Sequence, residues 1–180
     1  GSGIRIINND AYEIIISFII SANNNIKRIK NSIEYLCSHY GKNMGMYYAF
    51  PTLEELKKVS IQDYRNAGLG YRAEQMFDTV QTLTDEDIES LKKKNKDEQF
   101  KFLLSLKGVG EKVANCIMLF GLGVKDVFPV DTWINKVYNN LTNTNTTDRK
   151  KITKELTDRY KDLSGFAQQY FFYYYRDNNL

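Results

Sequence analysis

The sequence LKGVGEKVANC spans residues 106–116, and VFPVD follows it at residues 127–131. Apolar side chains recur at helical spacing before the glycines and again after them, which predicts two helices. Gly108 and Gly110 flank the apolar Val109 and permit backbone angles that other residues resist, so we expect a tight hairpin between the helices. Amides exposed in such a hairpin, next to a helix N-terminus, form a cradle for phosphate.

The same stretch predicts that an amine and a carboxylate lie close together. A helix that starts near Lys112 and runs to about Gly121 is roughly 15 Å long, at about 1.5 Å per residue. An extended segment over residues 123–130 can return that distance, which brings Asp131 back to Lys112 although it lies nineteen positions later. Asp131 also has a purely structural interpretation, as the N-cap of a helix over residues 132–140, and this does not exclude catalysis.

The chemistry of the pair indicates a candidate active site. An amine attacks only when it is neutral, and the positive end of a helix, together with partial burial, disfavours the ammonium form. A nearby carboxylate stabilises positive charge that develops in a substrate and assists proton transfer. The alternative is that Lys112 is one of many solvated lysines.

These residues resemble the helix-hairpin-helix DNA glycosylases, and within that superfamily the 8-oxoguanine DNA glycosylases. The resemblance implies that Lys112 attacks the sugar, expels the damaged base and forms a Schiff base that permits β-elimination of the strand. Asp131 would be its catalytic partner. The implied function is a bifunctional glycosylase and abasic-site lyase, which flips 8-oxoguanine opposite cytosine out of the duplex. Its implied partner is double-stranded DNA containing 8-oxoguanine or abasic sites.

Composition favours an all-α protein. The chain has 180 residues, abundant helix formers and a net charge of only +3, so charge alone is a weak argument for nucleic acid. The resemblance implies two helical lobes with a helix-hairpin-helix motif and a cleft between them. We expect an N-terminal helix within residues 1–25 that packs with the C-terminal lobe, a helical barrel lobe over residues 26–113 and a C-terminal lobe over residues 114–180.

The two cysteines are too few for a disulfide framework or for the four-cysteine iron–sulfur loop of endonuclease III relatives. We therefore expect no iron–sulfur cluster and no required cofactor, although a structural monovalent or divalent cation at the hairpin is compatible with the resemblance. No apolar run reaches membrane-spanning length. We expect an intracellular monomer without a membrane partner, located in the cytoplasm or nucleoid of a bacterium or the nucleus of a eukaryote.

Periodicity and capping residues predict the remaining helices, and no strand is expected. Thr52 followed by Glu55 is a capping box, and the helix after Thr84 has an acidic first turn. The predicted helices cover residues 11–21, 26–40, 61–67, 72–83, 84–93, 97–106, 112–121, 132–140, 148–160 and 164–176, and a further helix begins at the Thr52 cap.

Three residues match the base pocket of the 8-oxoguanine family. Cys116 lies one helical turn after Lys112, and the resemblance implies that it packs on one face of the base. Gln168 and Phe172 lie one turn apart on the last helix, where they would bond the base edge and stack on its other face. The alternative is that Cys116 and Phe172 are ordinary core residues, since free cysteine is often buried.

Four further residues match positions that fill the vacated stack and read the orphaned cytosine. Asn23 is the first of three consecutive asparagines, Asn23 to Asn25, at a predicted turn. Asparagine is common at helix caps and in turns, so a structural role alone explains one or two of the three. Arg28 and Arg72 match arginines that read the cytosine, and Tyr71 matches a tyrosine that wedges beside it. The alternatives are surface charges for the arginines and core filling for the tyrosine.

The sequence departs from the family pattern in three places. Trp133 stands where animal enzymes have a histidine that contacts phosphate, and Tyr175 stands at an acidic position. Nothing corresponds to the family's N-terminal sheet-containing domain, so we expect a fragment that lacks this domain.

Two other functions stay open: a glycosylase of the same fold for another damaged base, and a non-enzymatic DNA-binding module that needs neither Lys112 nor Asp131.

Overall fold

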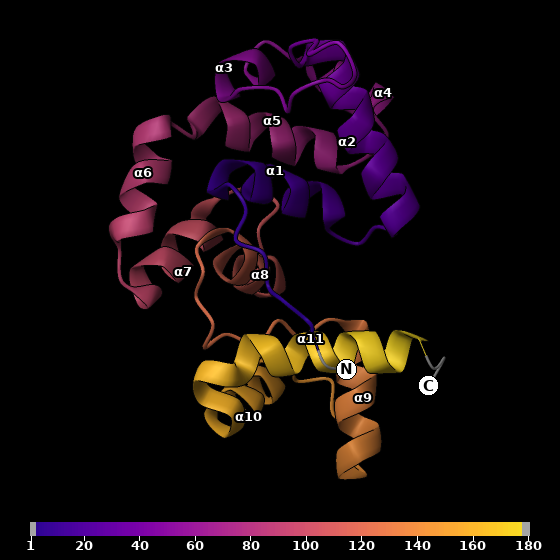
Figure 1. The fold of residues 1–180 in the computed structure, drawn as a ribbon, viewed down its shortest axis with the longest axis vertical. Helices are drawn as coiled ribbons and strands as arrows, with labels where there is room; N and C mark the ends of the chain where they lie inside the picture. The colour runs from indigo at the N-terminus through magenta and orange to yellow at the C-terminus, as the bar shows by residue number, and fades with distance from the viewer. Residues whose placement is uncertain (1–2, 178–180) are drawn as a thin grey trace. The chain divides into compact units, whose positions relative to one another are not determined.

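The structure is a computed structural model that describes the backbone of residues 3–177 and the side chains through Tyr175 (Figure 1). The described part is helical and has no strand, only an isolated bridge between Asn43 and Tyr48. None of its helices is both long and apolar enough to cross a bilayer. In chain order the helices are α1 (Ala11–Ser21), α2 (Ile26–Tyr40), α3 (Leu53–Leu56), α4 (Ile61–Asn66), α5 (Arg72–Thr82), α6 (Asp85–Lys93), α7 (Lys96–Ser105), α8 (Glu111–Gly121), α9 (Thr132–Thr142), α10 (Arg149–Tyr160), the 3-10 turn η1 (Lys161–Leu163) and α11 (Ser164–Asp177).

Capping chemistry accounts for where several of these helices begin. In α3 the Thr52 side chain accepts a hydrogen bond from the Glu55 amide, while the Glu55 carboxylate accepts one from the Thr52 amide. The same reciprocal pair joins Thr84 and Asp87 at the start of α6. These bonds satisfy amides that have no partner inside the helix, which is why the predicted starts agree with the observed ones.

The chain divides into two compact units. The larger unit is Asp10–Gly110, and the smaller unit combines Gly1–Asn9 with Glu111–Leu180. This division places α1 in the larger unit.

Helix α1 is central to the larger unit because it is apolar around most of its circumference. It packs against α2 and α5, and Ile15, Ile16, Ile19 and Ile20 are fully buried. A helix with so little polar surface is most stable when neighbours cover it on several sides. Within the larger unit α1 therefore groups with α2 and α5, and its packing with the C-terminal lobe stays a prediction.

In the smaller unit α9, α10 and α11 pack against one another (Figure 1). The segment between α8 and α9 contributes to their core, which also fixes the position of Asp131 at its end. The Gly165 amide donates to the Lys125 carbonyl oxygen at 2.8 Å, which attaches this segment to the start of α11. The core cluster consists of Phe128, Val130, Ile134, Ile152 and Leu156.

Candidate active site

Lys112, Cys116 and Asp131 come together in the smaller unit. Lys112 is the second residue of α8 and is half-buried, and Cys116 lies one turn further along the same helix. The Lys112 ammonium and the Asp131 carboxylate are both close enough to act electrostatically on the Cys116 thiol. The return segment therefore brings the carboxylate within electrostatic range of Cys116 on α8, and its proximity to Lys112 stays a prediction.

Asp131 has a structural role as well. Its Oδ1 accepts a hydrogen bond from the Ile134 amide at 2.8 Å, so it is the N-cap of α9. Its other carboxylate oxygen makes no hydrogen bond to any residue that the structure describes. The cap thus holds the carboxylate in one orientation and leaves Oδ2 available to a substrate.

The environment of Cys116 keeps its thiol neutral. Burial raises the pKa of Cys116 to about 11, while the adjacent Lys112 ammonium opposes this shift and Asp131 adds to it. The residue therefore presents an apolar, protonated sulfur beside the amine at neutral pH, and not a reactive thiolate.

Three helix N-termini meet around this group of residues. The Lys150 ammonium in the first turn of α10 pairs with the Glu111 carboxylate at the start of α8, at 2.8 Å. The Arg149 guanidinium donates to the hydroxyl of Thr132, the first residue of α9, at 3.3 Å. Because each helix start carries partial positive charge, their convergence favours a bound anion. Sequence reasoning missed these links, because nothing local joins α10 to the starts of α8 and α9.

Gln168 and Phe172 lie on α11, the helix that packs against α9. Gln168 is buried, and its Oε1 accepts a hydrogen bond from Gln169 at 2.6 Å. Phe172 is half-buried, whereas its neighbour Phe171 packs against Phe128 in the core. The register predicted for Phe172 is therefore compatible with a pocket residue, because Phe171 takes the core position. Contact with a base stays a prediction for both residues.

The two hairpin glycines differ in their backbone angles and in the space around them. Gly108 has φ +82°, and a Cβ there would lie 3.1 Å from the Gln75 Oε1 and 3.3 Å from the Ile19 Cγ2. Gly110 does not have positive φ and has open space where a Cβ would stand. The expectation that both need unusual backbone angles is corrected for Gly110, where the open space suits a close approach of a ligand to the backbone. Val109 between them is buried.

In the turn of three asparagines, two side chains have structural roles and the third is exposed. Asn24 donates to the Ile20 carbonyl oxygen, and Asn25 caps α2 by accepting from the Arg28 amide. Asn23 is exposed, has φ +48°, and its side chain makes no hydrogen bond in the described part of the chain. Arg28 is exposed in the first turn of α2, and its guanidinium likewise pairs with no described residue.

The exposures of Tyr71 and Arg72 exclude the two structural alternatives. Tyr71 is 59% exposed, so it is not a core filler, whereas Arg72 is only 4% exposed and is not a surface charge. The Arg72 guanidinium lies 5.0 Å from the centre of the Tyr71 ring, and its buried Nε has no hydrogen-bond partner among the described residues. A buried donor without a partner is costly, and a ligand that accepts from it would remove that cost.

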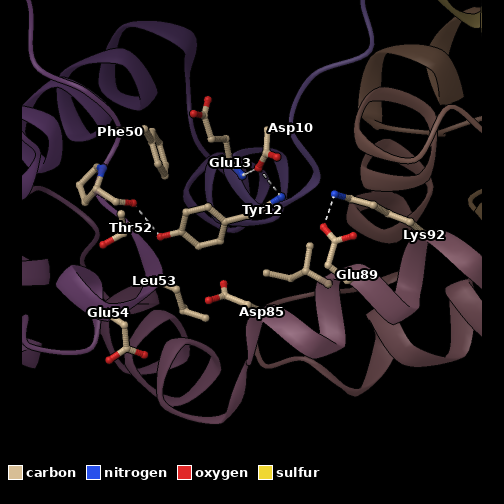
Figure 2. A pocket seen from close by; sticks show the side chains of 12 residues that line it. Asp10, Tyr12, Glu13, Phe50, Thr52, Leu53, Glu54, Asp85, Glu89 and Lys92 are labelled. Atoms are coloured by element: carbon tan, nitrogen blue, oxygen red, sulfur yellow. Dashed lines mark hydrogen bonds and ion pairs between the residues drawn. The ribbon is translucent and has the colours of Figure 1, made fainter.

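One cavity of the larger unit is lined by none of these residues. Its volume is about 430 Å³, and five carboxylates line it but only one amine, Lys92 (Figure 2). Lys92 is paired with Glu89, and the Tyr12 hydroxyl donates to the Pro51 carbonyl oxygen at its wall. An acidic cavity repels phosphate, so it is not a candidate DNA contact.

The sequence matches the HhH-GPD superfamily base excision DNA repair protein profile over residues 16–162. This match covers most of the chain. The chain belongs to the HhH-GPD superfamily. The all-α fold and the hairpin before α8 are therefore those of this superfamily.

The HhH-GPD chain is similar to named relatives along nearly its whole length. It is 33% identical over 187 residues to N-glycosylase/DNA lyase OGG1 of Arabidopsis thaliana, covering 94% of this chain and 51% of that protein. It is 30% identical over 195 residues to the probable N-glycosylase/DNA lyase of Methanothermobacter thermautotrophicus, covering 95% of this chain and 62% of that protein. The chain thus spans about half to two thirds of the length of these relatives.

Among solved structures, the chain resembles the 8-oxoguanine glycosylase/lyase of Clostridium acetobutylicum in complex with dsDNA containing cytosine opposite to 8-oxoG. The TM-score is 0.94 at 41% identity, over 100% of this chain and 64% of that one. The likeness to endonuclease III, at 19% identity and a TM-score of 0.68, concerns the fold alone. Within the described part of this HhH-GPD chain, no three His, Cys, Asp or Glu side chains gather as a metal site, and the predicted hairpin cation stays a prediction.

Proposed function

We propose that this HhH-GPD chain carries the chemistry of a bifunctional DNA N-glycosylase and abasic-site lyase that removes 8-oxoguanine opposite cytosine. The observation that carries the proposal is the convergence of Lys112, Cys116 and Asp131 at the N-terminal end of α8. A DNA-binding module of the same fold needs neither the amine nor the carboxylate. The similarity to proteins named N-glycosylase/DNA lyase supports the same conclusion.

The proposed reaction begins when the neutral Lys112 amine attacks C1′ of the flipped nucleotide. A C1′–N bond to lysine forms while the bond from C1′ to the base breaks, and the base leaves with the bonding electron pair and takes up a proton. Asp131 Oδ2 stabilises the positive charge that develops on the sugar. Ring opening gives an imine at Lys112, and loss of a C2′ proton then expels the 3′ phosphate oxygen by β-elimination.

The proposed base pocket consists of Cys116, Gln168 and Phe172. The neutral Cys116 sulfur would pack on one face of the base, since burial of the thiol keeps it uncharged. Phe172 would stack on the other face, and the Gln168 amide would hydrogen-bond the edge, because an amide offers both a donor and acceptors. Gln168 is already ordered by its bond to Gln169, so little rotamer freedom is lost on binding.

The proposed strand contacts lie in the larger unit. Asn23 has an exposed side chain in a left-handed turn, which suits insertion into the space that the flipped base leaves. Arg28, Tyr71 and Arg72 would read and flank the orphaned cytosine, and the unsatisfied Nε of Arg72 supports a polar ligand there. The hairpin Gly108–Val109–Gly110 would receive a backbone phosphate over the open side of Gly110. We further propose that the protein acts as a monomer on double-stranded DNA inside the cell.

The experiment that tests this function is borohydride trapping on two labelled duplexes. One duplex carries 8-oxoguanine opposite cytosine and the other an abasic site. We expect a covalent adduct with both, and we expect Lys112→Gln to abolish the adduct while DNA binding stays near normal. Lys101→Gln is a matched control, since Lys101 is an exposed lysine on α7.

The outcomes separate the possible functions. An adduct with the abasic duplex alone would leave lyase chemistry without base recognition and would refute the 8-oxoguanine assignment. Trapping that survives Lys112→Gln would assign the chemistry to another amine. A chain that binds both duplexes without any adduct would be a non-enzymatic DNA-binding module.

A further inference from the structure

The first turn of α10 is joined to the starts of two other helices of the smaller unit. The Lys150 ammonium lies 2.8 Å from the carboxylate of Glu111, the first residue of α8. The Arg149 guanidinium donates to the hydroxyl of Thr132, the first residue of α9, at 3.3 Å. Two consecutive side chains of one helix therefore reach the starts of two different helices.

Each of these two helix starts carries one residue of the proposed chemistry. Lys112 follows Glu111 directly on α8, and Asp131 precedes Thr132 directly as the N-cap of α9. The two bridges are thus attached one residue away from the proposed nucleophile and one residue away from its proposed partner. Because consecutive Cα atoms are only about 3.8 Å apart, a shift of either helix start carries the adjoining side chain with it.

The opposite end of α8 is held by backbone hydrogen bonding and packing. The Val124 amide donates to the Met118 carbonyl oxygen at 2.9 Å, and a Cβ on Gly165 of α11 would meet the Leu119 Cδ1 at 2.3 Å. Helix α10 packs against α9 and α11, whereas no comparable packing joins α8 to α9 or α10 among the described helices. The ion pair at Glu111 therefore supplies a link between the start of α8 and α10 that helix packing does not supply.

We infer that Lys150 and Arg149 are positioning residues, which fix the start of α8 relative to the start of α9 and so set the Lys112 amine against the Asp131 carboxylate. Each acts through the residue that it bonds and does not touch the substrate. The side chains of the Lys150–Glu111 pair are 78% and 41% exposed, so the pair adds little to stability. Its effect is on rate, because a displacement of about 1 Å in an active site can slow a reaction about 100-fold. This inference rests on the proposed function, because it assigns Lys112 and Asp131 to one reaction.

The main test removes the ion pair without changing the net charge. Glu111→Gln combined with Lys150→Met replaces one anion and one cation by neutral side chains of similar size, so the long-range attraction of DNA should stay the same. We expect single-turnover excision of 8-oxoguanine at saturating protein to slow by about ten-fold or more. The Kd for a duplex with an uncleavable tetrahydrofuran abasic analogue should stay within about three-fold. Lys150→Arg keeps the charge and should keep most of the excision rate.

A second ion pair on the same helix provides the matched control. Lys154 and Asp158 pair within α10 at 2.6 Å, and both side chains are exposed. Lys154→Met combined with Asp158→Asn therefore makes the same change in charge without removing a link to another helix, and it should keep the full excision rate. An equal loss of rate in this control, or an unchanged rate in Glu111→Gln/Lys150→Met, would overturn the inference.

The salt dependence of binding distinguishes a positioning residue from a direct DNA contact. Loss of one phosphate contact lowers the slope of log affinity against log salt by about 0.9, whereas loss of a positioning residue leaves this slope unchanged. We expect Lys150→Met, added to Glu111→Gln, to leave the slope as it is in Glu111→Gln alone. A slope that falls by about 0.9 would make Lys150 a DNA ligand and would refute its positioning role.

The bond from Arg149 is tested by a double-variant cycle. Arg149→Met and Thr132→Val each remove the same hydrogen bond, so each should slow excision by a similar factor and the two together should slow it no further. Losses of rate that multiply would show that the two residues act independently, which would remove Arg149 from the positioning role.

Hydrogen exchange of the DNA-free chain separates the inference from the proposed function. Amides in the first two turns of α8 should exchange faster in Lys150→Met, because the helix start loses a link, and Lys154→Met should leave them unchanged. Unaltered exchange in Lys150→Met would overturn the inference whether or not the chain is an enzyme. Faster exchange in a chain that forms no borohydride adduct supports the link between the helices and refutes the enzyme. A chain that forms the adduct, and whose Glu111→Gln/Lys150→Met variant reacts at the normal rate, refutes the inference and leaves the function standing.

Discussion

Lys112 and Cys116 lie one turn apart on α8, and the Lys112 ammonium opposes the rise in the pKa of the buried Cys116 thiol. This arrangement sets a polar amine beside a thiol that burial keeps neutral. The Asp131 carboxylate acts electrostatically on the same thiol, so the proposed nucleophile and its proposed partner share Cys116 as a neighbour. Reacting groups that are held close together need little reorganisation to act on a single sugar carbon.

The Cys116 thiol should make stability depend on pH in alkaline solution. Folding raises its pKa from 9.0 to about 11, so the folded state holds the proton more tightly than the unfolded state. The contribution of this group is complete below pH 9 and is lost as pH rises toward 11, by about 2–3 kcal/mol in all. Urea unfolding at several pH values measures this effect. Between pH 9 and pH 11 the free energy of unfolding should fall less for Cys116→Ala than for the unaltered chain. If the free energy of unfolding falls equally with pH in both proteins, the Cys116 thiol is not the cause.

The hairpin glycines should separate folding from DNA binding. Gly108→Ala should destabilise the protein by about 1–3 kcal/mol, because its φ is positive and the new methyl group would crowd Gln75 and Ile19. Gly110→Ala should change stability by no more than about 1 kcal/mol, since its backbone angles are ordinary and the space is open.

Thermal melts and binding to an abasic-analogue duplex measure these two effects. If a phosphate approaches the open side of Gly110, the Gly110→Ala methyl group should weaken binding at least ten-fold in a normally folded protein. Full DNA affinity in that variant would remove Gly110 from the phosphate cradle.

The two roles of Asp131 should be separable by substitution. Asparagine is also a good N-cap, so Asp131→Asn should keep the hydrogen bond to the Ile134 amide. Its free energy of unfolding should stay within about 0.5 kcal/mol of that of the unaltered chain. Asp131→Ala should lose the cap, which lowers the free energy of unfolding by about 1 kcal/mol. Both should slow single-turnover excision at least one hundred-fold, because each removes the charge. Excision at the normal rate by Asp131→Asn would show that the carboxylate acts only as a cap.

Arg28 should set the preference for the base opposite the lesion. Its guanidinium pairs with no described residue, and only its backbone amide takes part in the cap of α2, so Arg28→Ala should fold normally. We expect this variant to lose preference for cytosine in an excision assay with each of the four bases opposite 8-oxoguanine. Lys27→Ala, one position away on the same exposed turn, is the matched control. A preference that survives Arg28→Ala would assign the reading of cytosine elsewhere.

Burial in the core was harder to predict than helix position. Residues 170–175 are all aromatic, and periodicity alone does not tell which of them faces inward. The structure resolves this, because Phe171 packs on Phe128 and Tyr160 whereas Phe172 is half-buried. Arg72 is a second case, since an arginine beside a glycine turn has the sequence pattern of a surface charge, yet it is buried.

The sequence by itself determined the helices, their caps and the turn chemistry. Thr52, Thr84 and Asp131 predicted helix starts that are observed, because a cap depends on an amide only two or three positions away. Tertiary structure alone decided that α1 belongs with α2 and α5, that Gly110 faces open space, and that α10 reaches the starts of α8 and α9. These features arise from contacts between residues far apart in the chain. Such contacts depend on how whole elements fill the core, and they leave no pattern in the residues on either side.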